Sequence, residues 1–441
     1  MVLNHRVPGK GFGYMSKYTD YRCKAEPVIP KVMQALVARG SGFENLAVKE
    51  VPVPDVGPDQ LLARVDAAGV CTSIIKLVEQ GENHIFINGW DMKKWPVILG
   101  DEGSVTLVKI GDNLRDKYKA GQRCAIQPAV NVAPILYRER YKNNAEGMHK
   151  CAVGYTLGGQ LAQYIRIQEE VLEADCLLPL AEEGMGYFEV SMTEPISCVY
   201  SAQQRNYHIV KNGPHDDRKP HLGLLPGGIT VVIGAGVMGR VHAELSLRYS
   251  PAVLVITART RPRLDLTMKT LGEKAKARGT KLICVTADKL ADAVKKCSKG
   301  QGADDIILAV GDNAAQQYAL GLLAKGGVAN FFGGLPRGQH ILELDTLAVH
   351  YDEIKLVGSS GGEPSDMAAT LQAIANKQID AGNYVAAVGS LDNAIDVLKM
   401  IKERKIDGKA ILYPHIQQTP LQGVEYWSKE REEDFLNSRL Q

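Results

Sequence analysis

The sequence predicts an α/β protein of two domains, in which a doubly wound parallel sheet is joined to a small barrel-like β domain. Three observations support this prediction. The chain has 441 residues, which is long enough for two domains. Short strand-like segments separated by turn residues fill its first part, and buried apolar runs spaced by helix-length segments fill a later part.

The first part opens as β structure, because apolar and polar residues alternate from Met33 to Val65 between turn signals such as Gly57-Pro58. Shorter strand-like runs then follow, separated by Gly, Asp and Asn, at 97–99, 104–110, 123–126 and 161–167. This pattern favours a small closed or nearly closed barrel. The next stretch, from about 206 to 228, is rich in Pro, Gly, His and Asp, and we interpret it as a connector.

The later part alternates apolar runs with segments that are long enough for helices. The runs are ITVVI (229–233), AVLVI (252–256), KLICV (281–285), DIILAV (305–310) and VANFF (328–332). Such runs predict parallel strands covered by helices on both faces. Beyond 347 we expect one more strand, amphipathic helices near 366–377 and 391–404, and a strand at 409–413. The polar tail, 415–441, is expected to add at most a surface helix without a chemical role.

Composition limits the classes of function. Acidic and basic residues are nearly balanced, with a formal net charge of +2, so we expect no nucleic-acid or membrane partner and a small-molecule substrate. No apolar run approaches the roughly 20 residues that cross a bilayer, and the first residues lack the apolar stretch of a secretory signal. A cytoplasmic protein is expected. The eight cysteines are scattered and are interpreted mostly as small buried apolar residues, with Cys71 as the exception.

A glycine motif directly follows the run ITVVI: Gly234, Gly236 and Gly239 enclose Ala235, Val237 and Met238, and a helix-competent segment and a second apolar run come next. In this setting the first glycine makes a tight turn, the second lets backbone amides approach a pyrophosphate, and the third lets the helix pack on the strand. The motif predicts a Rossmann domain that binds a nicotinamide dinucleotide.

The residues after the second run bear on the choice of dinucleotide. Sites that prefer NAD usually have an acid there to hold the ribose hydroxyls. This chain has no acid in that place and instead has Arg259 and Arg261, which could pair with a 2′-phosphate. We therefore favour NADP(H) over NAD(H). The alternative is that both arginines are solvated and that the protein accepts either dinucleotide.

From Met33 to about Pro414 the sequence resembles the zinc-containing medium-chain dehydrogenases, which include alcohol, sorbitol and threonine dehydrogenases. The segments that carry the resemblance are VPVPDVGPDQLLARVDAAGVC, PVILGDEG, GGQLAQYIRI, TEPISC, the glycine motif, GADDIILAVG and LVGSSGG. The resemblance implies a GroES-like catalytic domain at 34–200, a Rossmann domain at 201–346 with a cofactor contact at Val310, and a return to the catalytic domain at 347–414. It leaves 1–33 and 415–441 as extensions.

The resemblance also implies a metal site. Cys71 matches the family's cysteine ligand, Ser73 the hydroxyl that touches the substrate oxygen, and Glu194 of TEPIS the third ligand of sorbitol-dehydrogenase-like members. Asp101 stands where the family has a histidine ligand, and Glu102 stands at the place of its movable glutamate. With one sulfur and two carboxylates, this set is acceptable for one catalytic Zn²⁺.

Two further departures accompany the change at Asp101. Ile74 stands where the family has the acid that orients the histidine ligand. This change is consistent with Asp101, because a carboxylate ligand has no ring N–H to donate to such an acid. Lys76 stands where the family has its relay histidine. The pattern therefore resembles the branch that includes sorbose-1-phosphate reductase. Lys76 could pass protons or attract an anionic substrate group, or it could be a surface lysine without a role. His84, in the enlarged segment after Cys71, is interpreted as an ordinary loop residue.

The sequence thus favours a metal-assisted oxidoreductase that interconverts a secondary alcohol and a ketone on a polyol, sugar or sugar phosphate. In this interpretation Ser73, Lys76 and Glu102 take part in catalysis, with Glu102 able to enter the metal's coordination sphere. Two alternatives keep the fold: a metal-free reductase of activated double bonds or quinones, and a cofactor-binding protein without catalysis. The resemblance implies that the four-cysteine zinc lobe of many family members would fall between about 129 and 155, and because Cys151 is the only cysteine there, no structural zinc is expected. A homodimer or homotetramer is expected by analogy.

Overall fold

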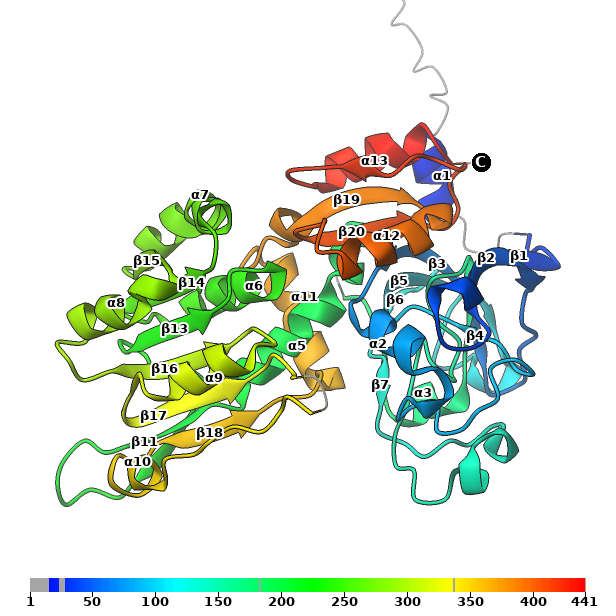
Figure 1. Cartoon of the computed structure of the whole chain (residues 1–441). Helices are drawn as coiled ribbons and strands as arrows, with labels where there is room; N and C mark the ends of the chain where they lie inside the picture. The colour runs from blue at the N-terminus through cyan, green and yellow to red at the C-terminus, as the bar shows by residue number, and fades with distance from the viewer. Residues whose placement is uncertain (1–15, 24–27, 182–183, 336–337, 441) are drawn as a thin grey trace, which may run out of the picture.

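The computed structural model describes residues 16–23, 28–181, 184–335 and 338–440, and Figure 1 shows two lobes side by side. One lobe contains mostly antiparallel β structure, and the other contains a parallel sheet with helices. The predicted fold class, a Rossmann sheet with a GroES-like β domain, is confirmed. None of the described helices is both long enough and apolar enough to cross a membrane.

The β domain contains two main sheets and one short strand pair. Its strands are β1 (Val32–Ala38), β2 (Leu46–Pro52), β3 (Leu61–Gly69), β4 (Val97–Ile98), β5 (Glu102–Ile110), β6 (Arg123–Ile126), β7 (Ala129–Val130), β8 (Cys151–Ala152), β9 (Tyr164–Ile167), β10 (Leu177–Pro179), β19 (Val385–Ser390), β20 (Lys409–Tyr413) and β21 (Gln422–Gly423). The larger sheet has the order β10-β6-β5-β3-β20-β19-β21 with β9 paired to β3, and the smaller has the order β2-β1-β4. β3 is buried along its whole length, because Leu61 and Leu62 belong to two different apolar cores.

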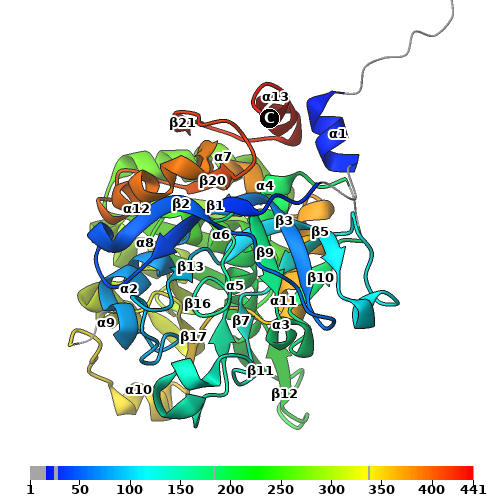
Figure 2. The same ribbon diagram turned by 90° about the vertical axis from the view of Figure 1, so that its right-hand side faces the viewer.

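The helices of this lobe are short and lie at the ends of strands. They are α1 (Lys17–Cys23), α2 (Ser73–Gln80), α3 (Glu169–Glu173), α4 (Tyr187–Ser191), α12 (Ala394–Lys402) and α13 (Lys429–Asn437). Figure 2 shows α1 and α13 next to each other at one end of the molecule.

The second lobe is a six-stranded parallel sheet of the order β15-β14-β13-β16-β17-β18. Its strands are β13 (Ile229–Ile233), β14 (Val253–Ala258), β15 (Lys281–Thr286), β16 (Ala303–Leu308), β17 (Leu323–Phe331) and β18 (Lys355–Gly358), and its helices are α6 (Val237–Ser246), α7 (Arg261–Ala277), α8 (Leu290–Cys297), α9 (Asn313–Leu320) and α10 (Thr346–Tyr351). Neighbouring residues of β13 face opposite layers. Val232 packs in the core that includes Leu264 of α7, and Val231 packs in the core that includes Leu290 of α8.

Two helices join the lobes. α5 (Thr193–Gln204) and α11 (Pro364–Ala375) lie between the sheets in Figure 1. Ile196 of α5, Leu245 of α6 and Leu371 of α11 belong to one apolar core. Because this core is continuous with residues of the β domain such as Val388, the junction fixes the position of one lobe against the other.

The structure differs from the sequence-based expectations in three segments. The stretch interpreted as a connector contains an antiparallel hairpin, β11 (Tyr207–Val210) and β12 (Lys219–Leu222). The chain past 347 first adds β18 to the parallel sheet before it returns to the β domain. The tail contains the expected helix, α13, but its Phe435 and Leu436 are buried in a core shared with α4, so it is more than a surface helix. Of the N-terminal extension, 1–15 and 24–27 lie outside the described residues.

Candidate functional site

A cleft of about 1190 Å³ lies between the two lobes and contains most of the predicted site. The β domain contributes Cys71, Ser73, Lys76, Asp101, Glu102, Glu194 and Lys409, and the parallel-sheet lobe contributes Gly236, Val237, Met238, Arg263, Phe332 and Gly334. Since residues of both lobes line one cavity, a ligand bound to the glycine motif and a second ligand at Cys71 can be neighbours.

Cys71, Asp101 and Glu102 form a compact group in the cleft, with one potential ligand atom of each within 4.8 Å of the others. Cys71 ends the turn after β3, and Asp101 and Glu102 lie at the start of the neighbouring strand β5. Gly100 makes the turn into Asp101 possible, because its φ is +109° and a Cβ there would overlap the backbone nitrogen of Leu161. The chain thus brings the three residues together through adjacent strands.

Hydrogen bonds orient this group and leave acceptors free. The Ser73 hydroxyl donates to Asp101 Oδ2 at 2.6 Å, and the Ser73 amide donates to Cys71 Sγ at 3.4 Å. Ser73 is also close enough to Tyr155 to act on its pKa, which burial raises well above its ordinary value. Asp101 Oδ1 and Glu102 Oε2 are buried and have no hydrogen-bond partner among the described residues.

The pKa values of the group reflect acidic groups held close together away from water. Burial, and then Glu102, raise the pKa of Asp101 to about 6. Burial raises the pKa of Cys71 well above its ordinary value, and Asp101 and Glu102 raise it further. Burial, Glu102 and Asp101 have the same effect on the pKa of Glu194. A cation bound here would relieve this repulsion.

Lys409 supplies the positive charge that the sequence analysis missed. Its ammonium group donates to Glu102 Oε1, and both side chains are buried. Burial acts to lower the pKa of Lys409, but Glu102 and Cys71 outweigh it and raise that pKa. Lys409 begins the apolar run KAILY. A lysine at the start of a strand predicted to be buried was the sequence signal that could have identified it as a site residue.

Glu194 stands apart from the compact group. It lies in the first turn of α5 and lines the same cleft, and the Cys198 thiol of the next turn donates to its Oε1 at 3.3 Å. The structure therefore brings Cys71 and Asp101 together with Glu102 rather than with Glu194. The group nevertheless fits a divalent cation, because a thiol sulfur and two carboxylates converge where two buried oxygens lack a partner.

The glycine motif has the backbone geometry that its sequence predicts. Gly234 has a φ of +104°, and a Cβ at this position would overlap Cγ1 of Val310. A Cβ on Gly239 would overlap the carbonyl oxygen of Gly234, so only glycine lets α6 approach β13 this closely. Gly236 precedes α6 and opens onto the cleft together with Val237 and Met238.

The predicted arginines lie outside the cleft. Arg259 and Arg261 are exposed at the end of β14, and Arg261 Nε is 2.9 Å from Asp265 Oδ1. Arg263 lines the cleft instead: its Nη1 is 3.9 Å from the position of a Cβ on Gly236, and its Nε is 3.3 Å from Asp407 Oδ2. Arg263 is a third arginine in the same segment, but the sequence offered no means to tell which of the three lines the cleft.

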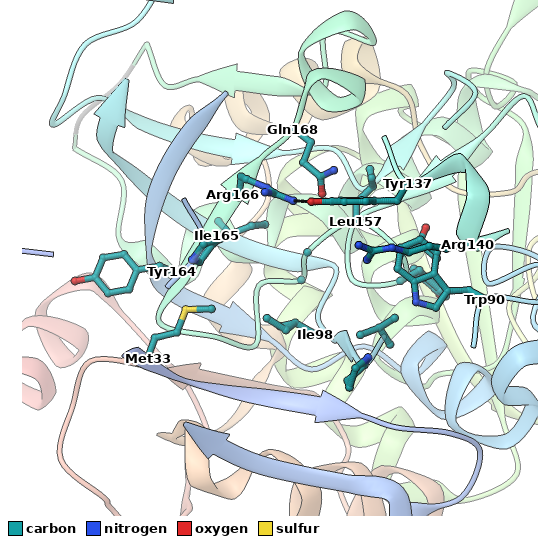
Figure 3. Close-up of a pocket in the computed structure, with 17 residues that line it drawn as sticks. Met33, Trp90, Ile98, Tyr137, Arg140, Leu157, Tyr164, Ile165, Arg166 and Gln168 are labelled. Atoms are coloured by element: carbon teal, nitrogen blue, oxygen red, sulfur yellow. Dashed lines mark hydrogen bonds between the residues drawn. The ribbon is translucent and has the colours of Figure 1, made fainter. Parts of the chain in front are cut away.

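A smaller cavity of about 190 Å³ lies behind the cleft, and Tyr155 lines both. Figure 3 shows Arg166 reaching the Tyr137 hydroxyl, to which its Nη2 donates at 3.1 Å, and Arg140 beside Trp90. The guanidinium carbon of Arg140 is 3.8 Å from the centre of the Tyr137 ring. These stacked contacts hold the segment that carries Tyr137 and Arg140, which lines the smaller cavity.

Comparisons with known proteins agree with this arrangement. Residues 57–175 match the family "Alcohol dehydrogenase GroES-like domain", and 252–376 match "Zinc-binding dehydrogenase". The mannitol-1-phosphate 5-dehydrogenase of Aliivibrio fischeri is 28% identical over 407 residues, covering 90% of this chain and 91% of that protein. The L-sorbose 1-phosphate reductase of Klebsiella pneumoniae is 29% identical over 359 residues, covering 80% and 82%. The crystal structure of 2R,3R-butanediol dehydrogenase from Bacillus subtilis has a TM-score of 0.66 at 19% identity, covering 87% and 99%.

Fold and sequence together place the chain in the zinc-type medium-chain dehydrogenase/reductase superfamily. Within that superfamily it is an alcohol oxidoreductase that depends on a nicotinamide dinucleotide. The resemblance that the sequence motifs indicated is thereby confirmed.

Proposed function

We propose that this enzyme interconverts a secondary alcohol and a ketone on a polyol, sugar or sugar phosphate with the assistance of a bound Zn²⁺. One observation carries the proposal: the buried group of Cys71, Asp101 and Glu102 shares a single cleft with the glycine motif. The sequence relatives named above support a polyol or sugar phosphate as the substrate.

In this proposal Cys71 and Asp101 hold the metal, with Glu102 and Glu194 as further carboxylates within the same cleft. The bound metal would polarise the substrate oxygen, and the dinucleotide would carry the hydride. Ser73 lies at the cleft surface, where its hydroxyl can pass a proton to the substrate oxygen during ketone reduction and take one back from water in the cleft. Asp101 orients that hydroxyl by accepting its hydrogen bond. Glu102 pairs with Lys409 through one oxygen, and its other oxygen has no partner among the described residues.

The test combines metal analysis with turnover. Purified enzyme should contain about one zinc per chain, and it should oxidise or reduce members of a panel of D-mannitol 1-phosphate, D-mannitol, L-sorbose 1-phosphate and L-sorbose. Cys71→Ala should lose both bound zinc and turnover while it retains the dinucleotide-induced shift in melting temperature. Full activity at negligible metal content would overturn metal assistance, and negligible metal with no turnover of the panel would favour the metal-free reductase of activated double bonds or quinones.

We also propose NADP(H) as the preferred dinucleotide. Arg259, exposed at the end of β14, and Arg263, in the cleft, support this choice because no acid occupies the end of that strand. Arg259→Gln should then weaken binding of NADPH more than binding of NADH, as measured by fluorescence titration. Equal weakening of both would contradict the preference. We propose no second, structural zinc, since 129–155 contains a single cysteine.

We propose finally that the enzyme is a homo-oligomer that associates through the edge of the parallel sheet. β18 is the last strand of that sheet and, among the described strands, pairs with β17 alone. Exposed apolar side chains gather on β18, on α10 and on the loop before it: Ile341, Leu344, Leu347, Val349, Tyr351 and Leu356. An unpaired edge flanked by apolar side chains is typical of a surface that is covered in the assembled protein.

A further inference from the structure

The wall of the cleft beyond Ser73 differs in charge from the metal-binding side. The enlarged segment after Cys71 contributes Lys76, His84 and Phe86 to this wall, and the residues before β8 contribute His149 and Lys150. The metal-binding side carries Cys71, Asp101, Glu102 and Glu194 against the single cation Lys409. On the outer wall the only carboxylate among the described lining residues is Glu146, which is exposed.

His84 is the buried centre of this wall. It is only 8% exposed, and its Nδ1 accepts a hydrogen bond from the Phe86 amide at 3.3 Å. Burial, and then Lys76, lower the pKa of His84, which favours the neutral ring. In a neutral ring whose Nδ1 is an acceptor, the proton is on Nε2. Among the described residues nothing accepts from that N–H, which is thus a free donor in the cleft.

The imidazole of His84 also lies near Ser73, because both are next to Tyr155. Its ring stacks on Tyr155, with 5.0 Å between the ring centres, and Tyr155 and Ser73 line the same cleft. Phe86 closes the aromatic group, with its ring centre 5.3 Å from that of Tyr155. A group held by His84 would therefore be part of the same ligand that meets Ser73.

Two lysines line the same cleft as the imidazole. Lys76 Nζ extends across the cleft to 4.0 Å from the position of a Cβ on Gly334, and Lys150 Nζ is 5.8 Å from the centre of the Phe86 ring. Within the described part of the chain, neither ammonium group forms an ion pair. Two uncompensated ammonium groups beside a free imidazole donor make a site for an anion.

We propose that Lys76, His84 and Lys150 form a subsite that binds the phosphate of a phosphorylated polyol or ketose. This inference rests on the proposed function, and it narrows the substrate from polyols in general to their phosphate esters. A phosphate monoester has nearly two negative charges and three acceptor oxygens, which match two ammonium groups and one N–H donor. A free polyol has no charge to offer these lysines. The interpretation of His84 as an ordinary loop residue is replaced accordingly.

The test measures a ratio, kcat/KM for D-mannitol 1-phosphate divided by kcat/KM for D-mannitol, or the same ratio for L-sorbose 1-phosphate and L-sorbose. Lys150→Met and His84→Phe should each lower this ratio about tenfold, which is the usual effect of losing one hydrogen bond to a charged group. His84→Phe keeps a ring that can stack on Tyr155. Lys142→Met removes an exposed lysine from the same part of the chain that does not line the cleft, and it should leave the ratio unchanged.

Melting temperatures show whether Lys150→Met or His84→Phe is unfolded. If one of them is unfolded, the ratio measured for the other tests the subsite. An unchanged ratio in a folded Lys150→Met or His84→Phe enzyme would overturn the subsite, while turnover of the panel would leave the proposed function intact. If the wild-type enzyme turned over nothing in the panel, the proposed function would fail instead. The subsite would then be decided by calorimetric titration with inorganic phosphate, which should bind the wild-type protein at least tenfold more tightly than Lys150→Met. Equal binding would overturn it.

Discussion

Lys409 controls the charge of the catalytic group, because its ammonium group is the only cation hydrogen-bonded to a carboxylate of that group among the described residues. Glu102 beside it is fully buried. A buried carboxylate that loses its partner carries a large desolvation cost. A metal ion at Cys71 and Asp101 would offset part of that cost, since it supplies positive charge to the same carboxylate.

Lys409→Met should therefore lower the free energy of unfolding by about 3 kcal/mol in protein treated with a chelator. The loss should be smaller in protein loaded with zinc. Chemical denaturation of both forms measures the difference. Lys402→Met is the matched control, because Lys402 is half exposed and pairs with the exposed Glu79, so its removal should change stability by less than about 1 kcal/mol. An equal loss with and without zinc would contradict a metal next to Glu102.

At the scale of single residues, the sequence could predict those site residues that lie in motifs shared with the family it resembles. Cys71, Ser73 and Asp101 could be found because short motifs carry them. Lys409 is 307 residues away from Glu102 along the chain, and no local pattern links them. His84 was interpreted as an ordinary loop residue for a related reason, since its stacking on Tyr155 involves a distant segment.

The turn between β13 and α6 separates two roles of glycine. A Cβ on Gly236 has space, because the nearest atom is Arg263 Nη1 at 3.9 Å, whereas a Cβ on Gly239 overlaps the backbone of Gly234. Gly236→Ala should thus fold normally but weaken dinucleotide binding at least tenfold, because the methyl group occupies the place where a pyrophosphate approaches.

Gly239→Ala should instead lower the melting temperature by several degrees, because α6 must move away from β13. Differential scanning fluorimetry with and without NADPH measures both effects at once. If Gly236→Ala were the less stable variant of the two, the assignment of roles would be reversed.

The C-terminal helix α13 is anchored by a buried carboxylate. Glu432 accepts hydrogen bonds from the backbone amides of Tyr187 and Phe188, both at 2.7 Å, and from the Tyr413 hydroxyl at 2.8 Å. Burial raises the pKa of Glu432 to about 7, although these donors act to lower it. In the unfolded chain the pKa returns to about 4.5. The folded state therefore binds this proton more tightly, and the stabilisation is present below about pH 4.5 and is lost as the pH rises through 7.

Glu432→Gln should accordingly flatten the fall in stability between pH 5 and pH 8. At pH 7 it should also cost about 2 kcal/mol, because an amide nitrogen would face one of the three donors. Unfolding curves across this pH range measure the slope. Glu433→Gln, on the same helix and without these bonds, provides the comparison and should keep the wild-type slope.

At the scale of elements, the parallel strands could be predicted from their apolar runs, because burial on both faces leaves a strong signal in composition. The hairpin β11–β12 gave no such signal. Its Tyr207, Ile209 and Leu222 are exposed, so its polar and turn residues dominate the pattern. The anchoring of α13 depends on Trp427 and Phe435, whose partners lie in α4 and in β20.

Among the described strands, β15 and β18 are the two edges of the parallel sheet, and exposed apolar side chains gather at the β18 edge. β18 offers a free edge, and Tyr351 and Leu356 beside it are 67% and 42% exposed. A second copy of the chain can pair with this edge about a two-fold axis, which would continue the sheet and cover both side chains. Burying a carboxylate at position 356 would oppose that association, because its charge would lose its water.

Leu356→Glu should therefore shift the protein from an oligomer toward a monomer, as measured by size-exclusion chromatography with light scattering over a range of concentrations. Met268→Glu is the matched control, because Met268 is an equally exposed apolar side chain on α7, away from the free edge. It should leave the assembly unchanged. Since the glycine motif lies far from Leu356 along the chain and lines the cleft, monomeric Leu356→Glu should still shift its melting temperature with NADPH. A wild-type monomer, or an oligomer that survives this substitution, would place the contact elsewhere on the surface.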